Sequence, residues 1–196
     1  MPLIDAALIA SRQAELTALW HERAVEPAGD GAMRAMEENH AFNFQLWHEE
    51  DRARRDDLGF EHVYRAKRAI DRLNQQRNNA VERLDDFLAA AAGLFPDGCP
   101  MHSETPGMIV DRLSILALKA YHMREEAERF DATPEHRAAC AAKLDTIERQ
   151  RSDLTAALAG LMEEIEGKTR GFRLYRQFKM YNDPSLNPEL YRTGAA

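Results

Sequence analysis

The segment 33–57 carries the residues that most clearly indicate chemistry. A helical wheel at about 100° per residue places aromatic and polar side chains together on one face: His40, Asn43, Phe44, Trp47, Asp51 and Arg54. Polar groups on a face that packs against a core must hydrogen-bond to one another, to neighbouring elements or to a ligand. The pattern therefore predicts either a buried polar network or a binding site.

Two further segments, 60–92 and 105–130, also place polar residues within an apolar stripe. These residues are Lys67, Asn74, Arg77 and Asn78 in the first segment and Asp111, Ser114 and Lys119 in the second. Three such helices would enclose one shared polar cavity. Its cations would outnumber its carboxylates, which favours a small anionic ligand. Because buried ion pairs also fix the register of bundles that bind no ligand, a purely structural role is the alternative for each residue.

For an enzyme acting in this cavity, we expect His40 or His48 to be the catalytic acid or base, with Asp51 orienting it. Glu37-x-x-His40 is half of a helical di-iron signature, but the chain has no second copy. His40 and His48 lie about 12 Å apart along a helix and cannot share an ion, whereas His48 and Asp51 could do so with a partner from another helix. The sequence therefore predicts no metal and no cofactor, with a metal-dependent helical enzyme as an alternative.

Five long helices are needed to position these residues. The expected helices span 5–25, 33–57, 60–92, 105–130 and 133–166. Asp5, Thr105 and Thr133 are the expected N-caps, and a proline follows each threonine at the first helical position. Apolar residues of the last helix recur at alternating three- and four-residue spacing, which predicts an antiparallel partner, most simply the helix before it. The fold class is all-α: a single antiparallel helical bundle that makes one domain of residues 1–196.

The tail, residues 168–196, differs from the bundle in composition. Five basic residues precede its first acidic residue, Asp183: Lys168, Arg170, Arg173, Arg176 and Lys179. Aromatic residues recur every three positions in the same stretch: Phe172, Tyr175, Phe178 and Tyr181. We expect a short basic-aromatic C-terminal helix and a tail that packs on or over the bundle. Its aromatic ridge would face the bundle, and Lys179, Tyr181 and Asn182 are candidate ligand-binding residues.

The composition limits the function classes. The chain has 31 Ala and 20 Leu against 4 Val and 7 Ile, which favours helix and argues against folds built from strands. A net charge of −7 argues against general nucleic-acid binding. The sequence has no run of about 18 apolar residues, so it predicts no membrane span. It also shows no signal-peptide pattern. Two cysteines are too few for a disulfide scaffold, so we expect a cytoplasmic protein with reduced thiols.

Four segments together resemble a bacterial family of domains of unknown function, number four-two-five-four in the usual series. The segments are 43–54 (NFQLWHEEDRAR), 70–78 (IDRLNQQRN), 111–119 (DRLSILALK) and 177–184 (QFKMYNDP). The resemblance implies an all-helical domain whose gene often lies beside glycosyltransferases for cell-surface glycans. It brings no established catalytic residues. The motifs contain the polar residues that the helical wheel singles out, which strengthens the case for a cavity.

We therefore expect a protein that binds a small anionic ligand, of sugar-phosphate or sugar-nucleotide type, in cell-surface glycan biosynthesis. Whether catalysis accompanies binding is not determined by the sequence. One alternative is a non-catalytic accessory partner of a glycosyltransferase, with the tail as its contact surface. Another is a chorismate-mutase-like enzyme, which only the helical architecture supports. A homo-oligomer is compatible with the sequence but is not required by it.

Overall fold

The computed structural model describes residues 3–192, except for the side chain of Asn182. Its five long helices are α1 (Ala6–Glu22), α2 (Gly31–Arg52), α3 (Phe60–Ala92), α4 (Pro106–Glu128) and α5 (Pro134–Glu166). The short elements are the 3₁₀ turns η1 (Asp56–Leu58) and η2 (Met180–Asn182) and the helix α6 (Pro188–Tyr191). The predicted all-α fold is confirmed, and the long helices end within a few residues of the expected positions.

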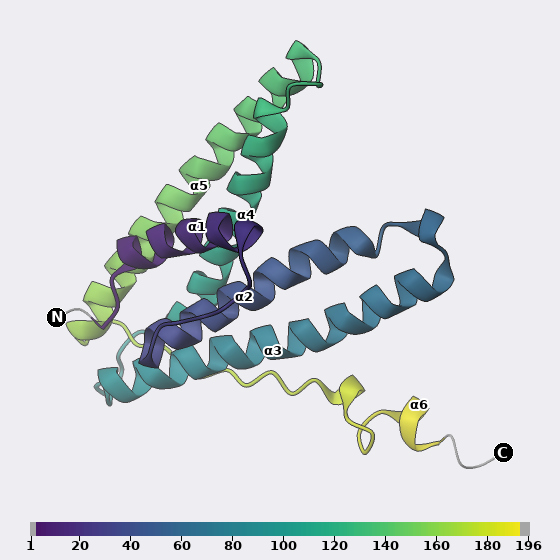
Figure 1. Cartoon of the computed structure of the whole chain (residues 1–196). Coiled ribbons are helices and arrows are strands. Elements are labelled where there is room, and N and C mark those ends of the chain that lie inside the picture. Colours follow the sequence, from purple (N-terminus) through teal and green to yellow (C-terminus); the bar gives the residue numbers. More distant parts are fainter. Residues whose placement is uncertain (1–2, 193–196) are drawn as a thin grey trace.

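Four of the five long helices form two antiparallel hairpins that diverge from a common base (Figure 1). One hairpin consists of α2 and α3, and the other of α4 and α5. The expected pairing of the last two long helices is thus confirmed. Helix α1 lies across the base and contacts α2, α4 and α5. Every helix within residues 3–192 is too short or too polar to be a bilayer-spanning segment.

The largest apolar cluster lies where the two hairpins and α1 meet. All five long helices and the start of the tail contribute buried side chains to it, among them Ile9, Met36, Leu84, Leu113, Leu158, Ile165 and Phe172. A second cluster, further along α1, joins α2 and α4 through Leu16, Trp20, Phe44 and Leu118. Burial of these side chains holds the crossing helices together, and the polar residues discussed below lie beside this second cluster.

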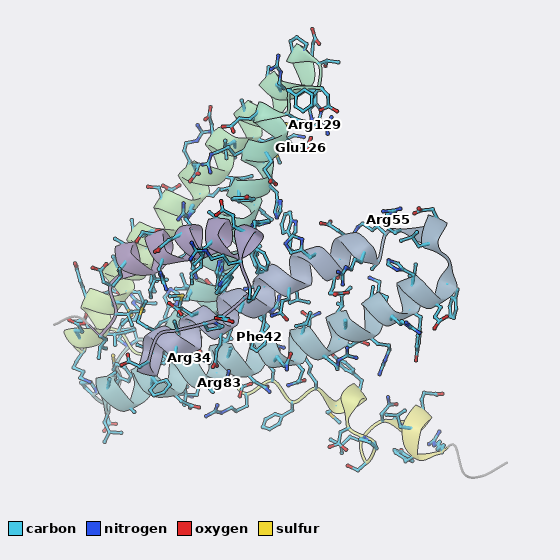
Figure 2. The ribbon with its side chains drawn as sticks, in the orientation of Figure 1. Arg34, Phe42, Arg55, Arg83, Glu126 and Arg129 are labelled. Carbon is cyan, nitrogen blue, oxygen red and sulfur yellow. The ribbon has the colours of Figure 1, made fainter. Side chains whose placement is uncertain are left out.

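The base of the first hairpin also carries ion pairs between its two helices. Arg34 on α2 and Arg83 on α3 lie close together there (Figure 2), and both bind Glu38, at 2.8 and 2.6 Å. These side chains are partly exposed, so the pairs contribute only about 0–1 kcal/mol each. The apolar clusters therefore account for most of the stability of the base.

The N-terminus of α4 is fixed by hydrogen bonds from its own cap and from α3. Thr105 caps the helix as predicted, as do Asp5 on α1 and Thr133 on α5. The buried carboxylate of Asp85 accepts hydrogen bonds from the Thr105 hydroxyl and from the Gly107 N–H, the latter at 2.7 Å. Burial raises the pKa of Asp85 to about 6. A Cβ atom on Gly107 would lie 2.6 Å from Asp85 Oδ1, so only glycine allows this close approach.

The tail departs from the prediction. Residues 172–179 form no regular secondary structure, so the expected basic-aromatic helix is absent there. The short helix α6 lies further along the chain, outside the basic-aromatic segment. Of the four aromatic residues only Phe172 is buried, whereas Phe178 is 84% exposed. A helix here would set Arg170, Arg173 and Arg176 three residues apart on one face, where like charges repel.

The tail instead lies along α3, where a basic side chain of the tail forms ion pairs with acidic residues of the helix. It follows this helix away from the base (Figure 1). Arg176 binds Glu82 at 3.1 Å and Asp86 at 2.6 Å. Asn78 donates a hydrogen bond to Gln177 at 2.8 Å. Beyond the buried Phe172, the tail therefore contacts α3 through polar groups rather than through an aromatic ridge.

We expect the substitution Gly107→Ala to destabilise the protein by about 1–3 kcal/mol, because the new methyl group displaces Asp85 from the start of α4. Gly160→Ala on α5 is the matched control, since nothing lies within 4 Å of its Cβ position. The control should gain about 0.5–1 kcal/mol from helix propensity. Urea unfolding of both variants measures the difference, and equal stability changes would contradict this account of Gly107.

Candidate functional site

A cleft of about 460 Å³ lies between α2, α3 and α4. Six of the predicted site residues line it: Asn43, Trp47, Asp51, Arg54, Asn74 and Arg77. Glu50 also lines the cleft, and it binds Arg54 at 2.9 Å and the exposed Lys67 at 3.6 Å. The lining thus contains two guanidinium groups and two carboxylates. The excess of cations expected from the sequence is not observed, because the carboxylates face the same cleft.

Beside the cleft, side chains of α1, α2 and α4 form a continuous buried hydrogen-bond network. The Asn43 amide donates to Asp111 Oδ1 at 2.9 Å and to Ser114 Oγ at 3.0 Å. His40 Nδ1 lies 2.7 Å from Ser114 Oγ, and His40 Nε2 lies 3.0 Å from Thr17 Oγ1. The network joins three helices at their crossing and satisfies polar groups that would otherwise be buried without partners.

The partners of His40 determine its tautomer. The Thr17 hydroxyl donates to the carbonyl oxygen of Gln13 at 2.8 Å, so it accepts a hydrogen bond from His40 Nε2–H. His40 Nδ1 then carries no proton and accepts from the Ser114 hydroxyl. Burial lowers the pKa of His40 to about 3, so the ring is neutral near pH 7. The ring is completely buried, and no direct proton transfer to a ligand in the cleft is possible in this geometry.

Asp111 connects the network to the cleft. Its Oδ1 atom accepts hydrogen bonds from Asn39 at 2.7 Å and from Asn43. Arg77 Nε lies 3.9 Å from the same oxygen, which is beyond hydrogen-bond distance. This Nε–H group is buried and has no hydrogen-bond partner within residues 3–192. Arg77 therefore retains a donor for an acceptor that the protein itself does not supply.

Two predicted residues lie away from the cleft. Lys119 is exposed and lines a different cavity, of about 550 Å³, between α4 and α5. Eight residues separate it from Asp111, which rotates it by about 80° on the helix. Asn78 is buried and holds the tail through Gln177. The single shared cavity expected from the sequence is therefore wrong: the polar residues divide between a cleft, a closed network and separate surfaces.

The candidate residues of the tail lie in another part of the structure. Lys179 lines a cavity of about 420 Å³ with Gln75 and Phe178. Burial and the positive charge of Arg77 lower the pKa of Lys179, so the tail passes near the polar residues of α3. Tyr181 is 64% exposed. The side chain of Asn182 lies outside the described part of the structure.

The carboxylate of Glu37, the other residue of the half di-iron pattern, binds groups of the protein itself. It accepts hydrogen bonds from the backbone N–H groups of Ala28 and Gly29 and binds Arg12 at 2.8 Å. The side chain thereby anchors the loop between α1 and α2.

A histidine cluster lies at the crossing of α1, α2 and α4. One ring nitrogen from each of His21, His48 and His122 lies within 4.8 Å of the others. His21 Nδ1 donates to the Thr17 carbonyl at 2.7 Å, and His122 Nδ1 donates to the Glu125 carboxylate at 2.8 Å. The Nε2 atoms of both rings are buried without a partner in the described part of the chain. Burial, together with the two neighbouring histidines, lowers the pKa of His48.

Trp47 joins the histidine cluster to the cleft. Its ring stacks on His122 with centroids 4.7 Å apart and also lines the cleft. Asp51 acts on His48 only through its charge, because no hydrogen bond within residues 3–192 joins it to His48 or His40. The expected Asp51-oriented histidine base is therefore not formed. Sequence reasoning missed His21 and His122 as site residues, and the available signal was that three helices each carry a histidine on an inner face.

Comparison with known proteins identifies a family for the chain. The model of the family described as "Protein of unknown function (DUF4254)" matches residues 33–174, and the chain belongs to this family. No curated protein and no solved structure has a significant match. The matched range includes all residues that line the cleft and two members of the histidine cluster, His48 and His122.

We expect the buried His40 to make the protein acid-sensitive. The unfolded chain takes up a proton on this ring below about pH 6.5, whereas the folded chain resists protonation down to about pH 3. Stability is therefore lost as the pH falls through this window, by about 2 kcal/mol between pH 7.5 and pH 5. His40→Gln should lack this contribution.

Chemical unfolding at pH 7.5 and pH 5 gives the change in the free energy of unfolding between the two pH values. The difference in this change between the wild type and His40→Gln is the contribution of His40, because the contributions of all other titratable groups cancel. Thr17→Ser keeps the hydroxyl acceptor and serves as the matched control, which should retain the pH dependence of the wild type. Equal pH dependence in the wild type and His40→Gln would show that His40 is not held neutral.

Proposed function

We propose that this member of the DUF4254 family binds a small anionic ligand, of sugar-phosphate or sugar-nucleotide type, in the cleft between α2, α3 and α4. The observation that carries the proposal is Arg77, which lines the cleft and whose buried Nε–H group has no hydrogen-bond partner within residues 3–192, since Asp111 Oδ1 lies 3.9 Å away. A phosphate or carboxylate oxygen is the strongest acceptor for such a donor. Arg54 lines the same cleft and can add a second guanidinium.

The remaining lining suits the hydroxyl groups of a sugar. Carboxylates of Glu50 and Asp51 accept hydrogen bonds, and the amides of Asn43 and Asn74 both donate and accept. Trp47 adds a flat apolar surface. The balance of charge in the cleft favours a ligand that carries both an anionic group and several hydroxyl groups over a simple inorganic anion.

The assignment to bacterial cell-surface glycan biosynthesis rests on the family resemblance, because genes of such domains often lie beside glycosyltransferases. The cytoplasmic location that we propose rests on the sequence features given above. We propose binding rather than a particular reaction. The completely buried His40 does not reach the cleft, and no histidine is among the described residues that line it.

We expect sugar phosphates or sugar nucleotides to raise the melting temperature of the full chain, and Arg77→Gln to weaken their binding about 10- to 100-fold, because a charged hydrogen bond is lost. Calorimetric titration gives the affinity. Arg72→Gln is the matched control: it removes an exposed arginine of the same helix that does not line the cleft, and it should bind as the wild type does.

A second cleft variant separates binding from stability. Asn74→Ala removes a cleft side chain that makes no hydrogen bond within residues 3–192, so it should weaken binding with little effect on melting. Parallel titrations with the unphosphorylated sugar test whether binding requires the anionic group of the ligand. The proposal fails if no compound of either class binds, or if Arg77→Gln and Asn74→Ala bind as tightly as the wild type.

The exposed tail favours a second candidate function, that of an accessory partner of a glycosyltransferase. Phe178, Met180 and Tyr181 are each more than half exposed, and the segment is basic. Exposed apolar side chains grouped on one segment are typical of protein interaction sites.

We expect a chain truncated after Gln177 to lose binding to a glycosyltransferase encoded beside its gene, because the truncation removes the exposed aromatic residues. The truncation keeps the buried Phe172 and the ion pairs of Arg176, so the bundle should melt as the full chain does. Pull-down with both chains measures the complex. A complex that survives the truncation, or that does not form with the full chain, excludes the tail as the contact.

A further inference from the structure

We infer that His21, His48 and His122 form a binding site for one divalent transition-metal ion, with Zn²⁺ as the expected occupant. The three side chains come from three different helices, and one nitrogen of each lies within 4.8 Å of the other two. This inference is independent of the proposed ligand in the cleft.

The distances are compatible with coordination after small side-chain movements. Nitrogen ligands about 2.1 Å from a tetrahedral metal lie about 3.4 Å from one another. The three nitrogens must therefore approach one another by at most about 1.4 Å, which is within the reach of small χ rotations. The helices themselves need not move.

The hydrogen bonds of two rings direct the free nitrogen lone pairs toward the cluster. A carbonyl or carboxylate oxygen can only accept, so Nδ1 of His21 and of His122 must carry the proton. In both rings Nε2 is then an unprotonated lone pair. Histidine ligands of metals characteristically donate their other N–H group to a carbonyl or a carboxylate in this way.

The same two Nε2 atoms have no other partner. Both are buried, and neither accepts a hydrogen bond from the described part of the protein. A buried acceptor without a donor is costly, and a bound cation would remove that cost. The Nε2 atom of His62 is also buried without a partner, but only His21 and His122 have ring nitrogens grouped with that of a third histidine.

The ligand set points to the class of metal. Three neutral imidazoles suit Zn²⁺, Cu²⁺ or Ni²⁺, whereas Mg²⁺ and Ca²⁺ prefer oxygen ligands. The half-buried His48 provides the route by which an ion enters. Stacking of His21 on Tyr121 and of His122 on Trp47 holds two rings in place. Three protein ligands leave a fourth position for water or for another ligand.

The full chain, freed of metal with a chelator and dialysed, is titrated with Zn²⁺ alone by calorimetry. We expect one ion per chain with a dissociation constant in the micromolar range or below. His48→Gln and His122→Gln should each weaken binding at least about tenfold. His62→Gln, which removes a histidine on α3 outside the cluster, is the matched control and should bind as the wild type does.

Co²⁺ substitution supplies a second readout, because its visible spectrum reports coordination by nitrogen. The wild type should give an intense visible band that Zn²⁺ displaces and that His48→Gln lacks. Melting curves of the metal-free variants show that they are folded, and His48→Gln is the milder change because the His48 side chain makes no hydrogen bond within residues 3–192. Absence of stoichiometric Zn²⁺ binding, or equal binding by the wild type and both cluster variants, would overturn the inference.

Discussion

A neutral imidazole at the crossing of three helices is the constraint on which the site depends. His40 is completely buried, and both of its nitrogens need partners of the correct kind, because an unpaired polar group is costly in an apolar region. Thr17 on α1 and Ser114 on α4 are those partners. Changing the crossing of α1, α2 and α4 would break both bonds, so the polar network and the apolar clusters around it stabilise the same arrangement of helices.

Helix α2 carries both the network and the cleft, one after the other along its length. The part of this helix nearer the base supplies Asn39, His40 and Asn43 to the closed network, and Asn43 also lines the cleft. Its second half supplies Trp47 and Asp51 to the cleft. The network gives way to the cleft as the two hairpins diverge (Figure 1). Near the base, side chains of α2 are covered by the neighbouring helices, and further from the base they are not. The same residue spacing therefore gives a dry network in one part and an accessible lining in the other.

The fold could be predicted from sequence because its signals are local. Proline after Thr105 and Thr133 marks two helix starts, and the spacing of Leu158, Leu161 and Ile165 indicates the pairing of α5 with α4. The helical wheel also identified six of the ten residues that line the cleft. It placed side chains on faces correctly but could not tell which faces meet, since that depends on the angle between the hairpins.

The incorrect placement of Lys119 and the missed histidine cluster share this cause. Lys119 shares the polar stripe of its helix but faces α5 rather than the cleft. His21 and His122 lie far apart in the sequence, and only the docking of α1 on α4 brings them to His48. The tail was misjudged for a different reason: its positive charges find acidic partners on α3, a long-range interaction that no local pattern reveals.

The hydrogen bonds around His40 have a direction. Asn43 donates to Ser114, Ser114 to His40, His40 to Thr17, and Thr17 to the carbonyl oxygen of Gln13. Each hydroxyl has a single proton, and the carbonyl at the end of the chain can only accept. Reversing one link would set two donors or two acceptors against each other unless every other link reversed as well. The five residues consequently behave as one polarised unit, whose dipoles add along the line from α2 to α1 and which has a single stable arrangement of its protons.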